Sequence, residues 1–248
     1  MDENQVWFRF YEELNDFLPS FKRKVTFSYS YKGSPSVKDA IESLGVPHVE
    51  VDVIIVNGIP VGFSYKLNNE DQISVYPVFE SIDISGINRL RPEPLRNPKF
   101  IPDVHLGKLS RYLRLLGFDT FFKDFMDDNE IIEISLREKR IILTRDKNLL
   151  KHKEITHGYW IRSQKPKIQL KEVLSRFDLS GIVKPFTRCL ECNNLVTQVP
   201  KYEILDGLKL KTKEFYTEFW KCQGCNRIYW EGSHYESMKK FVEFIIAS

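Results

Sequence analysis

The sequence lacks the long apolar run that a membrane-spanning helix needs. No stretch of its 248 residues approaches ~18 consecutive apolar positions, and the amino end, MDENQVWFRF, lacks the basic and then apolar regions of a signal peptide. Tracts of biased composition are also missing, while 42% of the residues are hydrophobic and 13% are aromatic. This composition is enough for packed cores. We therefore expect a soluble, cytoplasmic, globular α/β protein with no membrane partner.

Cysteine is scarce, and its spacing is informative. The four cysteines form two Cys-x-x-Cys pairs, Cys189 with Cys192 and Cys222 with Cys225, separated by 29 residues. Two such turns can each offer two thiolates to one tetrahedral Zn²⁺. Because four soft ligands fill the coordination sphere, we expect this zinc to be structural. The alternative, two redox motifs, lacks a thioredoxin-like helical context.

A large excess of one charge is missing too, but the charge is unevenly distributed. The formal net charge is +3, made up of −4 over residues 1–98, +5 over 99–182 and +2 over 183–248. A basic middle beside a mildly acidic front is expected if a polyanion binds the later part, because Lys and Arg neutralise phosphates. Ordinary solvated surface charge would give the same counts.

The first segment, residues 1–87, has the pattern of a β-grasp domain. We expect strands at 6–11, 25–31, 51–56, 59–65 and 71–78, and a helix at 37–44. Ser36 is a suitable N-cap for that helix, and Gly45 follows its end. Asn57-Gly58 is the pair best suited to the positive φ angles of a tight hairpin.

A linker and an alternating segment follow. Residues 88–98, NRLRPEPLRNP, hold three prolines and three arginines without apolar periodicity and are predicted to be a linker. In residues 99–183 we expect strands at 99–103, 118–123, 141–144 and 159–162, helices at 106–116, 129–140 and 169–177, and a helical turn at 148–152. This order predicts a parallel sheet, whose catalytic groups collect beyond the carboxyl ends of the strands.

Three aspartates occupy such positions. Asp103 and Asp146 each follow an apolar strand, and Asp128 stands at a helix start. Three carboxylates meeting at one edge would repel one another unless cations compensated them, and hard oxygen ligands suit Mg²⁺ or Mn²⁺. Such ions can activate water against a phosphodiester. The alternative is that Asp128 and Asp146 only cap the elements that follow them.

Several stretches of the sequence resemble those of a known family. PDVHLGKLSRYLRLLGFDT, DDNEIIEISLREKRIILTRDKNLL and IQLKEVLSRF resemble the PIN-like ribonuclease domain of the Mut7-C family. TRCLECNNLV and FWKCQGCNRIYWEGSHYESM are similar to the zinc ribbon appended in that family. SVKDAIESLGVP, VDVIIVNGIPV and DQISVYPVF look like the ubiquitin-like fold of sulfur carriers, and a ubiquitin-like domain is a known arrangement ahead of the nuclease.

The resemblance covers essentially the whole chain and implies three domains. These are a ubiquitin-like β-grasp domain over 1–87, a PIN-like nuclease domain over 99–183, and a zinc ribbon with a C-terminal helix over 184–248. A carrier role for the first domain is not expected, because it runs on through PVFESIDISG with only a lone Gly86 in place of a terminal Gly-Gly.

Carried over by matching positions, Asp103, Asp128 and Asp146 correspond to acids of a PIN-type site. The resemblance implies Mg²⁺- or Mn²⁺-dependent hydrolysis of single-stranded RNA, with these aspartates as metal ligands. PIN domains often carry a fourth acid shortly after the third, whereas this chain has Lys147 and Asn148 there. That departure puts a second metal position in doubt. Asp124 and Asp127 are possible auxiliary ligands.

Further positions are candidates for RNA contacts. Basic residues that could grip the phosphate backbone are Arg145, Lys108, Arg111 and Arg114. We place Arg145 first because it adjoins Asp146. Residues 209–220, KLKTKEFYTEFW, alternate like a strand and either stack unpaired bases or form the small core of the zinc domain. His234 either contacts a phosphate or is bonded within the ribbon and its closing helix, which we expect over 238–247.

Three functions compete at this level. The first is a metal-dependent ribonuclease. The second is a non-catalytic RNA-binding or ribosome-associated adaptor, which the missing fourth acid keeps open. The third is a protein-interaction module in which the β-grasp domain recruits a protein partner. The sequence favours the first.

Overall fold

The structure, a computed structural model, describes residues 4–77, 90 and 97–247. These residues form two compact units, one within 1–96 and 128–160 and the other within 97–127 and 161–248. Most of the predicted linker over 88–98 lies outside the described residues, and the domain boundaries drawn from the sequence stay predictions. None of the helices in the described part combines the length and apolar character needed to cross a membrane.

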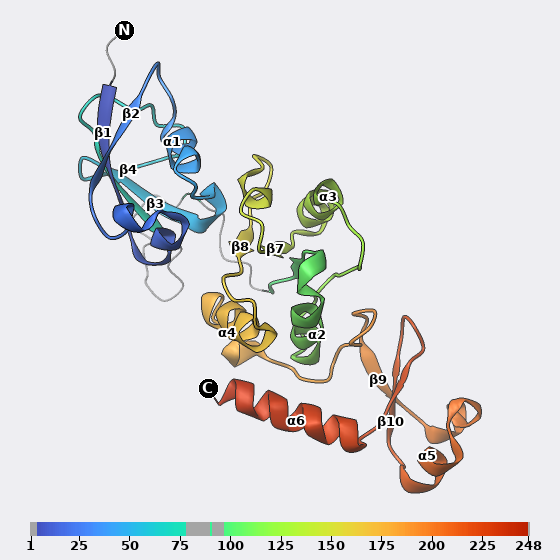
Figure 1. The fold of residues 1–248 in the computed structure, drawn as a ribbon. Coiled ribbons are helices and arrows are strands. Elements are labelled where there is room, and N and C mark those ends of the chain that lie inside the picture. The colour runs from blue at the N-terminus through green and yellow to red at the C-terminus, as the bar shows by residue number, and fades with distance from the viewer. Residues whose placement is uncertain (1–3, 78–89, 91–96, 248) are drawn as a thin grey trace. The chain divides into compact units, whose positions relative to one another are not determined.

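The first unit contains a five-stranded sheet with the order β2-β1-β5-β3-β4 (Figure 1). Its strands are β1 (Asn4–Phe10), β2 (Phe27–Tyr31), β3 (Val51–Val56), β4 (Ile59–Val61) and β5 (Gln72–Pro77). β1 and β5 run parallel, and the other neighbours are antiparallel. With helix α1 (Val37–Ser43), this arrangement confirms the predicted ubiquitin-like fold.

Local chemistry explains these elements. The side chain of Ser36 accepts a hydrogen bond from the backbone N–H of Asp39, whose carboxylate accepts one from the backbone of Ser36, a capping box that starts α1. Asn57 and Gly58 have φ values of 49° and 84°, as the predicted hairpin turn requires.

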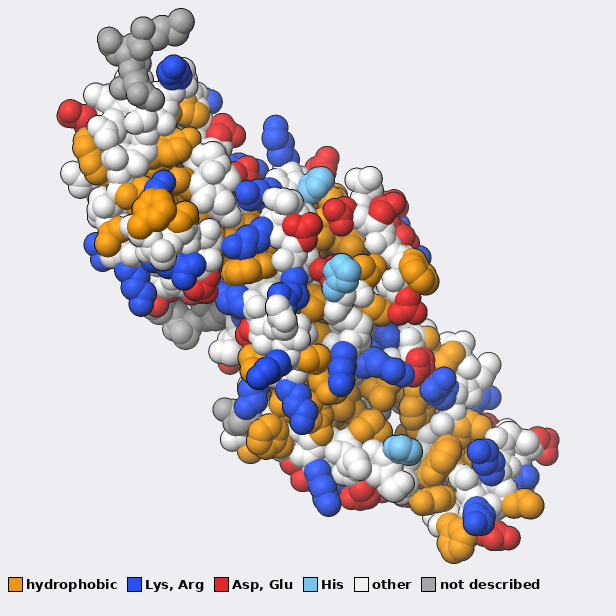
Figure 2. Space-filling model, in the orientation of Figure 1, with side chains coloured by type: hydrophobic (Ala, Val, Ile, Leu, Met, Phe, Trp, Pro, Cys, Tyr) orange, Lys and Arg blue, Asp and Glu red, His pale blue; other side chains and the backbone are white. Residues whose placement is uncertain are grey.

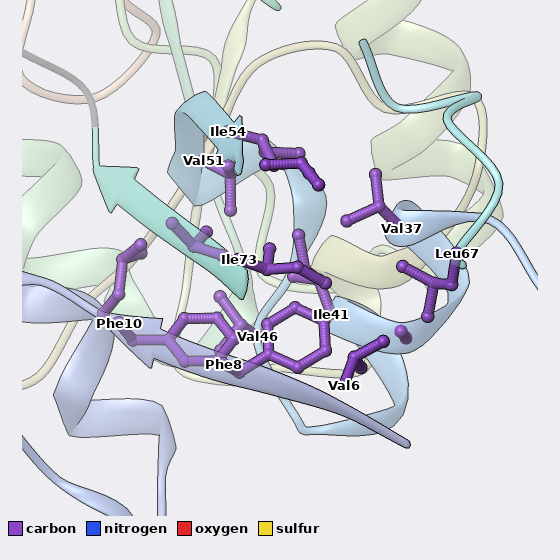
Figure 3. Close-up of a cluster of buried hydrophobic side chains, with 14 of the residues drawn as sticks. Val6, Phe8, Phe10, Val37, Ile41, Val46, Val51, Ile54, Leu67 and Ile73 are labelled. Carbon is purple, nitrogen blue, oxygen red and sulfur yellow. The ribbon is translucent and has the colours of Figure 1, made fainter. Parts of the chain in front are cut away.

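Alternate residues of the sheet and one face of α1 form the core of the β-grasp domain. Phe8 and Phe10 stack with ring centroids 5.7 Å apart, and Ile41 of α1 lies with Ile54 and Ile73 in the same cluster (Figure 3). All five side chains are buried. In β1 the buried side chains, Val6, Phe8 and Phe10, stand at every second position, as a strand with one face on the core requires.

The first unit also contains helix α3 (Asp128–Glu138) and the parallel strands β7 (Ile141–Thr144) and β8 (Gly158–Trp160). Gly158 allows a close approach here, because a Cβ at this position would lie 2.6 Å from a methyl carbon of Leu150. These elements match the helix and strands predicted for this stretch.

The second unit combines the remaining elements of the nuclease segment with a small sheet. They are β6 (Phe100–Pro102), α2 (Gly107–Leu115), α4 (Pro166–Arg176), β9 (Val196–Val199), α5 (Leu210–Phe215), β10 (Phe219–Cys222), β11 (Ile228–Tyr229) and α6 (Ser233–Ile246). The small sheet is antiparallel with the order β11-β10-β9. Helix α6 packs on its neighbours through Tyr112–Phe241 and Phe186–Tyr235 ring contacts.

Two predicted strands are wrong in extent. Residues 118–123 form only a parallel bridge between Phe100 and Thr120, because Pro102, the next residue of β6 in line to pair, has no backbone N–H to donate. Residues 209–220 do not alternate as one strand. Leu210–Phe215 are helical, and only Phe219 and Trp220 join β10.

Candidate metal centre and nucleic-acid surface

The structure brings the four cysteines together, as their spacing predicted. Their sulfur atoms lie within 4.8 Å of one another. Cys189 Sγ is 3.6 Å from Cys225 Sγ, and Cys192 Sγ is 3.2 Å from Cys222 Sγ. These separations exceed the ~2.05 Å of a disulfide and approach the ~3.8 Å between sulfurs around a tetrahedral zinc with ~2.3 Å bonds. The cluster could form a zinc site.

Tight turns present these sulfur atoms. The turn after the first pair places Asn193 at φ 70°, a left-handed conformation that asparagine tolerates. In the second pair, the backbone N–H groups of Gly224 and Cys225 point at Cys222 Sγ, at 3.3 and 3.5 Å. A thiolate is the form that gains most from such donors. The turns are therefore already shaped for thiolate ligands.

Tyr229 supports this cluster and was not predicted from the sequence. Its hydroxyl lies 3.0 Å from Cys189 Sγ. Burial and the hydrogen bond to Cys189 raise the pKa of Tyr229 above its ordinary value, so the hydroxyl stays protonated and donates to the sulfur. Hydrogen bonds of this kind orient metal ligands and tune their charge.

Asp103 stands directly after β6 and is only 6% exposed. Its Oδ1 atom accepts a hydrogen bond of 2.9 Å from the backbone N–H of His105, which makes Asp103 the N-cap of the 3-10 turn Val104–Leu106. One carboxylate oxygen is thereby held in a fixed position at the carboxyl end of a strand. This is the position that the sequence predicted.

Asp146 repeats this geometry in the other unit. It stands two residues after β7, its Oδ1 accepts a 2.8 Å hydrogen bond from the N–H of Asn148, and its own N–H donates to Thr144 Oγ1. Asp128 is the first residue of α3, and both Asp128 and Asp146 are exposed. Since Asp103 belongs to one compact unit and these two to the other, the meeting of the three carboxylates stays a prediction.

Three of the basic residues predicted to bind RNA, Lys108, Arg111 and the buried Arg114, line a hollow of about 750 Å³ in the second unit, which we call the basic groove. Lys108 and Arg111 of α2, Lys123 and His234 contribute positive or titratable groups to it, and Tyr112, Phe122 and Phe241 contribute aromatic rings. Figure 2 shows Lys and Arg side chains gathered over α2, α4 and α6, with hydrophobic side chains between them. Asp124 and Glu191 also line the groove, and Glu191 pairs with Arg111.

Arg114 has a different position from that expected of an RNA contact. It is 3% exposed, and its guanidinium donates to the carbonyl oxygens of Thr120, Leu190 and Glu191 at 2.8–3.0 Å. Burial lowers the pKa of Arg114, although nearby thiols and the Glu191 carboxylate act to raise it. The structure thus gives Arg114 a structural role, fastening the first cysteine turn to α2, and we leave it out of the proposed RNA contacts.

The segment around Asp146 contacts the β-grasp domain through Trp160. The indole Nε1 donates to the carbonyl oxygen of Arg145 at 3.2 Å, and its ring lies 4.9 Å from that of Phe17. The ammonium of Lys147 lies 4.0 Å from the Trp160 ring centroid and 4.9 Å from that of Phe17. The position where PIN domains often carry a fourth acid is therefore engaged in cation–π contacts.

Two more residues of the β-grasp domain reach this segment. The fully buried Glu50 accepts a 2.7 Å hydrogen bond from the backbone N–H of Trp160. The Nδ1 atom of His48 lies 2.6 Å from Glu42 Oε1, and its Nε2 atom lies 3.0 Å from the carbonyl oxygen of Ile155. The sequence assigned no role to His48. Nothing in the residues around Glu50 predicted that this charged side chain would be buried.

Comparison with known families matches both halves of the chain. The family described as Mut7-C RNAse domain matches residues 98–242, more than half of the chain, and the family described as Mut7-C ubiquitin matches residues 3–83. Comparison with curated proteins and with solved structures gave no match. The first match confirms the family inferred from the sequence motifs, and the second agrees with the β-grasp sheet. The chain therefore belongs to the Mut7-C family, with a domain of ribonuclease type preceded by a ubiquitin-like domain.

Proposed function

We propose that this protein is a metal-dependent ribonuclease that hydrolyses phosphodiester bonds of single-stranded RNA. The observation that carries the proposal is the shared geometry of Asp103 and Asp146. Each follows a short strand that pairs in parallel, and each has its Oδ1 atom held by the backbone amide two residues further on. This restraint fixes the direction of a carboxylate, which a metal ligand requires.

Asp103, Asp128 and Asp146 are the proposed ligands of Mg²⁺ or Mn²⁺. Their donor chemistry fits, because carboxylate oxygens are the ligands that these hard cations prefer. A bound ion would supply Lewis-acid stabilisation of the scissile phosphate and a lowered pKa for the attacking water. Arg145, half-buried beside Asp146, would offset part of the phosphate charge.

The basic groove is proposed to hold the RNA chain. Lys108, Arg111 and Lys123 would meet phosphates, while the aromatic rings of the groove offer flat surfaces for unpaired bases. A paired A-form helix would keep its bases stacked away from these rings, which favours single strands.

The four cysteines are proposed to hold one structural Zn²⁺. A reducing compartment such as the cytoplasm keeps these thiols available. The β-grasp domain remains a candidate for contacts with a protein partner.

Cleavage of end-labelled single-stranded RNA tests this function. Wild type should cut with Mg²⁺ or Mn²⁺ and stop when these are withheld. Asp103→Asn and Asp146→Asn should each lose roughly 100-fold or more in rate, since metal stabilisation of phosphoryl charge amounts to several kcal/mol. Asp206→Asn, an exposed change in the zinc ribbon, is the matched control and should cut normally.

The outcome separates the nuclease from a second candidate, an RNA-binding adaptor. The contacts of Lys147 at the fourth-acid position favour that candidate. If folded Asp103→Asn and Asp146→Asn proteins cut like wild type, or if RNA binds tightly and no substrate is cut with either ion, the nuclease proposal is wrong. Product lengths will report endo- or exonucleolytic action.

A further inference from the structure

A second hollow in the same unit differs from the basic groove in its lining. It has a volume of about 330 Å³ and lies between the loop at 185–190, the small sheet and the start of α6. Five aromatic side chains line it: Phe186, Trp220, Tyr229, Trp230 and Tyr235. We call it the aromatic pocket. It shares Leu115, Leu190 and Met238 with the basic groove, so the two hollows adjoin.

The aromatic walls are set by the local fold. Trp220 and Tyr229 are direct cross-strand partners on β10 and β11, which places both rings on one face of the small sheet. On the opposite side, Phe186 and Tyr235 lie with ring centroids 4.6 Å apart. The rings therefore come from the loop at 185–190, from β10, from β11 and from α6, and they line one space.

Two local features hold aromatic rings at this pocket. Phe186 has φ 61°, a left-handed conformation that is rare for a bulky residue and strains the backbone. A Cβ on Gly232 would lie 2.9 Å from the indole nitrogen of Trp230, so glycine lets this ring take its position at the pocket. Trp230 remains 37% exposed and accessible.

The pocket also has a polar group at its margin. Glu231 is exposed, and burial together with this neighbouring carboxylate raises the pKa of the Tyr235 hydroxyl. Arg188, the one Lys or Arg residue in the lining, is engaged with Asp119 and with the carbonyl oxygens of Gly117 and Asn193. A ligand in the pocket thus contacts flat aromatic faces and one carboxylate. The positively charged side chains lie in the adjoining basic groove.

We propose that the aromatic pocket binds one unpaired nucleobase of the RNA whose phosphates lie in the basic groove. The volume falls within the ~300–1,000 Å³ of small-molecule sites. Aromatic faces stack with any base, and the Glu231 carboxylate accepts from the amino groups of guanine, adenine or cytosine, which uracil lacks. The positively charged side chains of Lys108, Arg111 and Lys123 lie in the adjoining basic groove. Their charge complements the phosphates of a nucleic acid chain better than an apolar peptide. The inference rests on the proposed function and adds a subsite to it.

The test measures RNA binding by fluorescence anisotropy, in an Asp146→Asn background so that the RNA stays intact. The probes are end-labelled oligoadenylate, oligouridylate and an abasic ribose-phosphate oligomer. Trp230→Ala and Tyr235→Ala should weaken oligoadenylate binding roughly 5- to 150-fold, the range found when one base–aromatic stack is removed. Binding of the abasic oligomer should not change. Tyr202→Ala, an exposed aromatic outside both hollows that is 74% exposed, should bind like the parent.

Specificity gives an independent measurement. Oligoadenylate should bind more tightly than oligouridylate, and Glu231→Gln should reduce that difference. Adenosine monophosphate alone should quench tryptophan fluorescence from Trp220 and Trp230, and Trp230→Ala should reduce that quenching. Zinc content and circular dichroism establish that each variant is folded.

The outcomes distinguish the two proposals. If RNA is bound and cut normally but Trp230→Ala and Tyr235→Ala match wild type, the pocket inference fails and the nuclease stands. If Tyr202→Ala weakens binding as much as they do, or the abasic oligomer loses as much affinity as oligoadenylate, the pocket is not a base site. If wild type binds no RNA, both proposals fail.

Discussion

The β-grasp domain and the zinc ribbon both contact the nuclease segment, but through different chemistry. The N-terminal contact is largely aromatic: Trp160 packs on Phe17, and one desolvated carboxylate, Glu50, accepts its backbone N–H. In the C-terminal contact, Arg114 bonds the carbonyl oxygens of Leu190 and Glu191, and Asn193 accepts from the backbone N–H of Thr120. Apolar contact tolerates small shifts, whereas hydrogen bonds to carbonyl groups need those groups held in place.

Two of the three carbonyl groups that Arg114 bonds belong to Leu190 and Glu191, inside the first Cys-x-x-Cys turn. Asn193, which contacts Thr120 and Asp119, follows that turn directly. The proposed zinc would hold this turn in place, so the ribbon's attachment to α2 should depend on the metal. The N-terminal contact has no such dependence.

Metal removal should therefore produce the largest difference between the C-terminal and the N-terminal contact. With a chelator, or in Cys192→Ser, residues 184–232 should lose their hydrogen-exchange protection, because structural zinc binding contributes ~10 kcal/mol or more to folding. Strands β1–β5 should keep theirs. Exchange mass spectrometry of the full chain measures both regions at once. Protection of 184–232 that survives complete metal loss would contradict the expected coupling.

Arg114→Met should loosen the C-terminal contact alone. It removes three hydrogen bonds from a buried charged group, and we expect a loss of about 4 kcal/mol in unfolding free energy of the second unit. Urea denaturation followed by the fluorescence of Trp220 and Trp230 reports this. Arg114→Lys keeps the charge but not the fork of donors, so it should recover only part of the loss. Full recovery would mean that charge, not geometry, fastens the ribbon.

Trp160→Leu should loosen the N-terminal contact by about 2 kcal/mol, through lost ring contact with Phe17 and the lost indole hydrogen bond. Trp160→Phe keeps a ring and should lose less. Differential scanning calorimetry measures the change. Because the indole bonds the carbonyl oxygen of Arg145, RNA cleavage should fall as well. Unchanged stability and cleavage in Trp160→Leu would show that this contact is dispensable.

Asp39→Asn should have the smallest effect, at most about 1 kcal/mol, confined to the β-grasp domain. Hydrogen bonds from the Ser36 side chain and then its backbone lower the pKa of Asp39 below its ordinary 3.8. The carboxylate therefore stabilises the fold above that value, and the benefit is lost as pH falls through the folded-state pKa. The melting temperatures of wild type and variant should differ at pH 7 and converge as the pH falls below 3.8. A difference that does not shrink below pH 3.8 would contradict this assignment.

Sequence reasoning succeeded where a short stretch carries its own signal. The Asn57-Gly58 turn and the capping box at Ser36 depend on local backbone conformation, which neighbouring residues specify. It failed where the pairing partner decides the outcome. The predicted strand at 118–123 pairs with β6 only around Thr120, because Pro102 of β6 has no N–H for the next bond.

Candidate sites divide in the same way. Four cysteines at knuckle spacing predicted their own cluster, since soft ligands in two tight turns have few other uses. Arg114 and Lys108 look alike in the sequence, both basic and both on α2, yet one is buried and the other exposed. Which way a helical side chain faces depends on what packs against the helix.

The sequence alone determined the family, the order of elements in the β-grasp domain, the cysteine cluster and the candidate aspartates. Each of these rests on periodicity, residue spacing or sequence motifs. Only the tertiary structure decided that Trp160 joins Phe17 and Glu50 to the segment carrying Asp146, and that five rings from separate elements line one pocket. Such contacts form between residues far apart in the sequence, where packing and desolvation, not local conformation, select the partner.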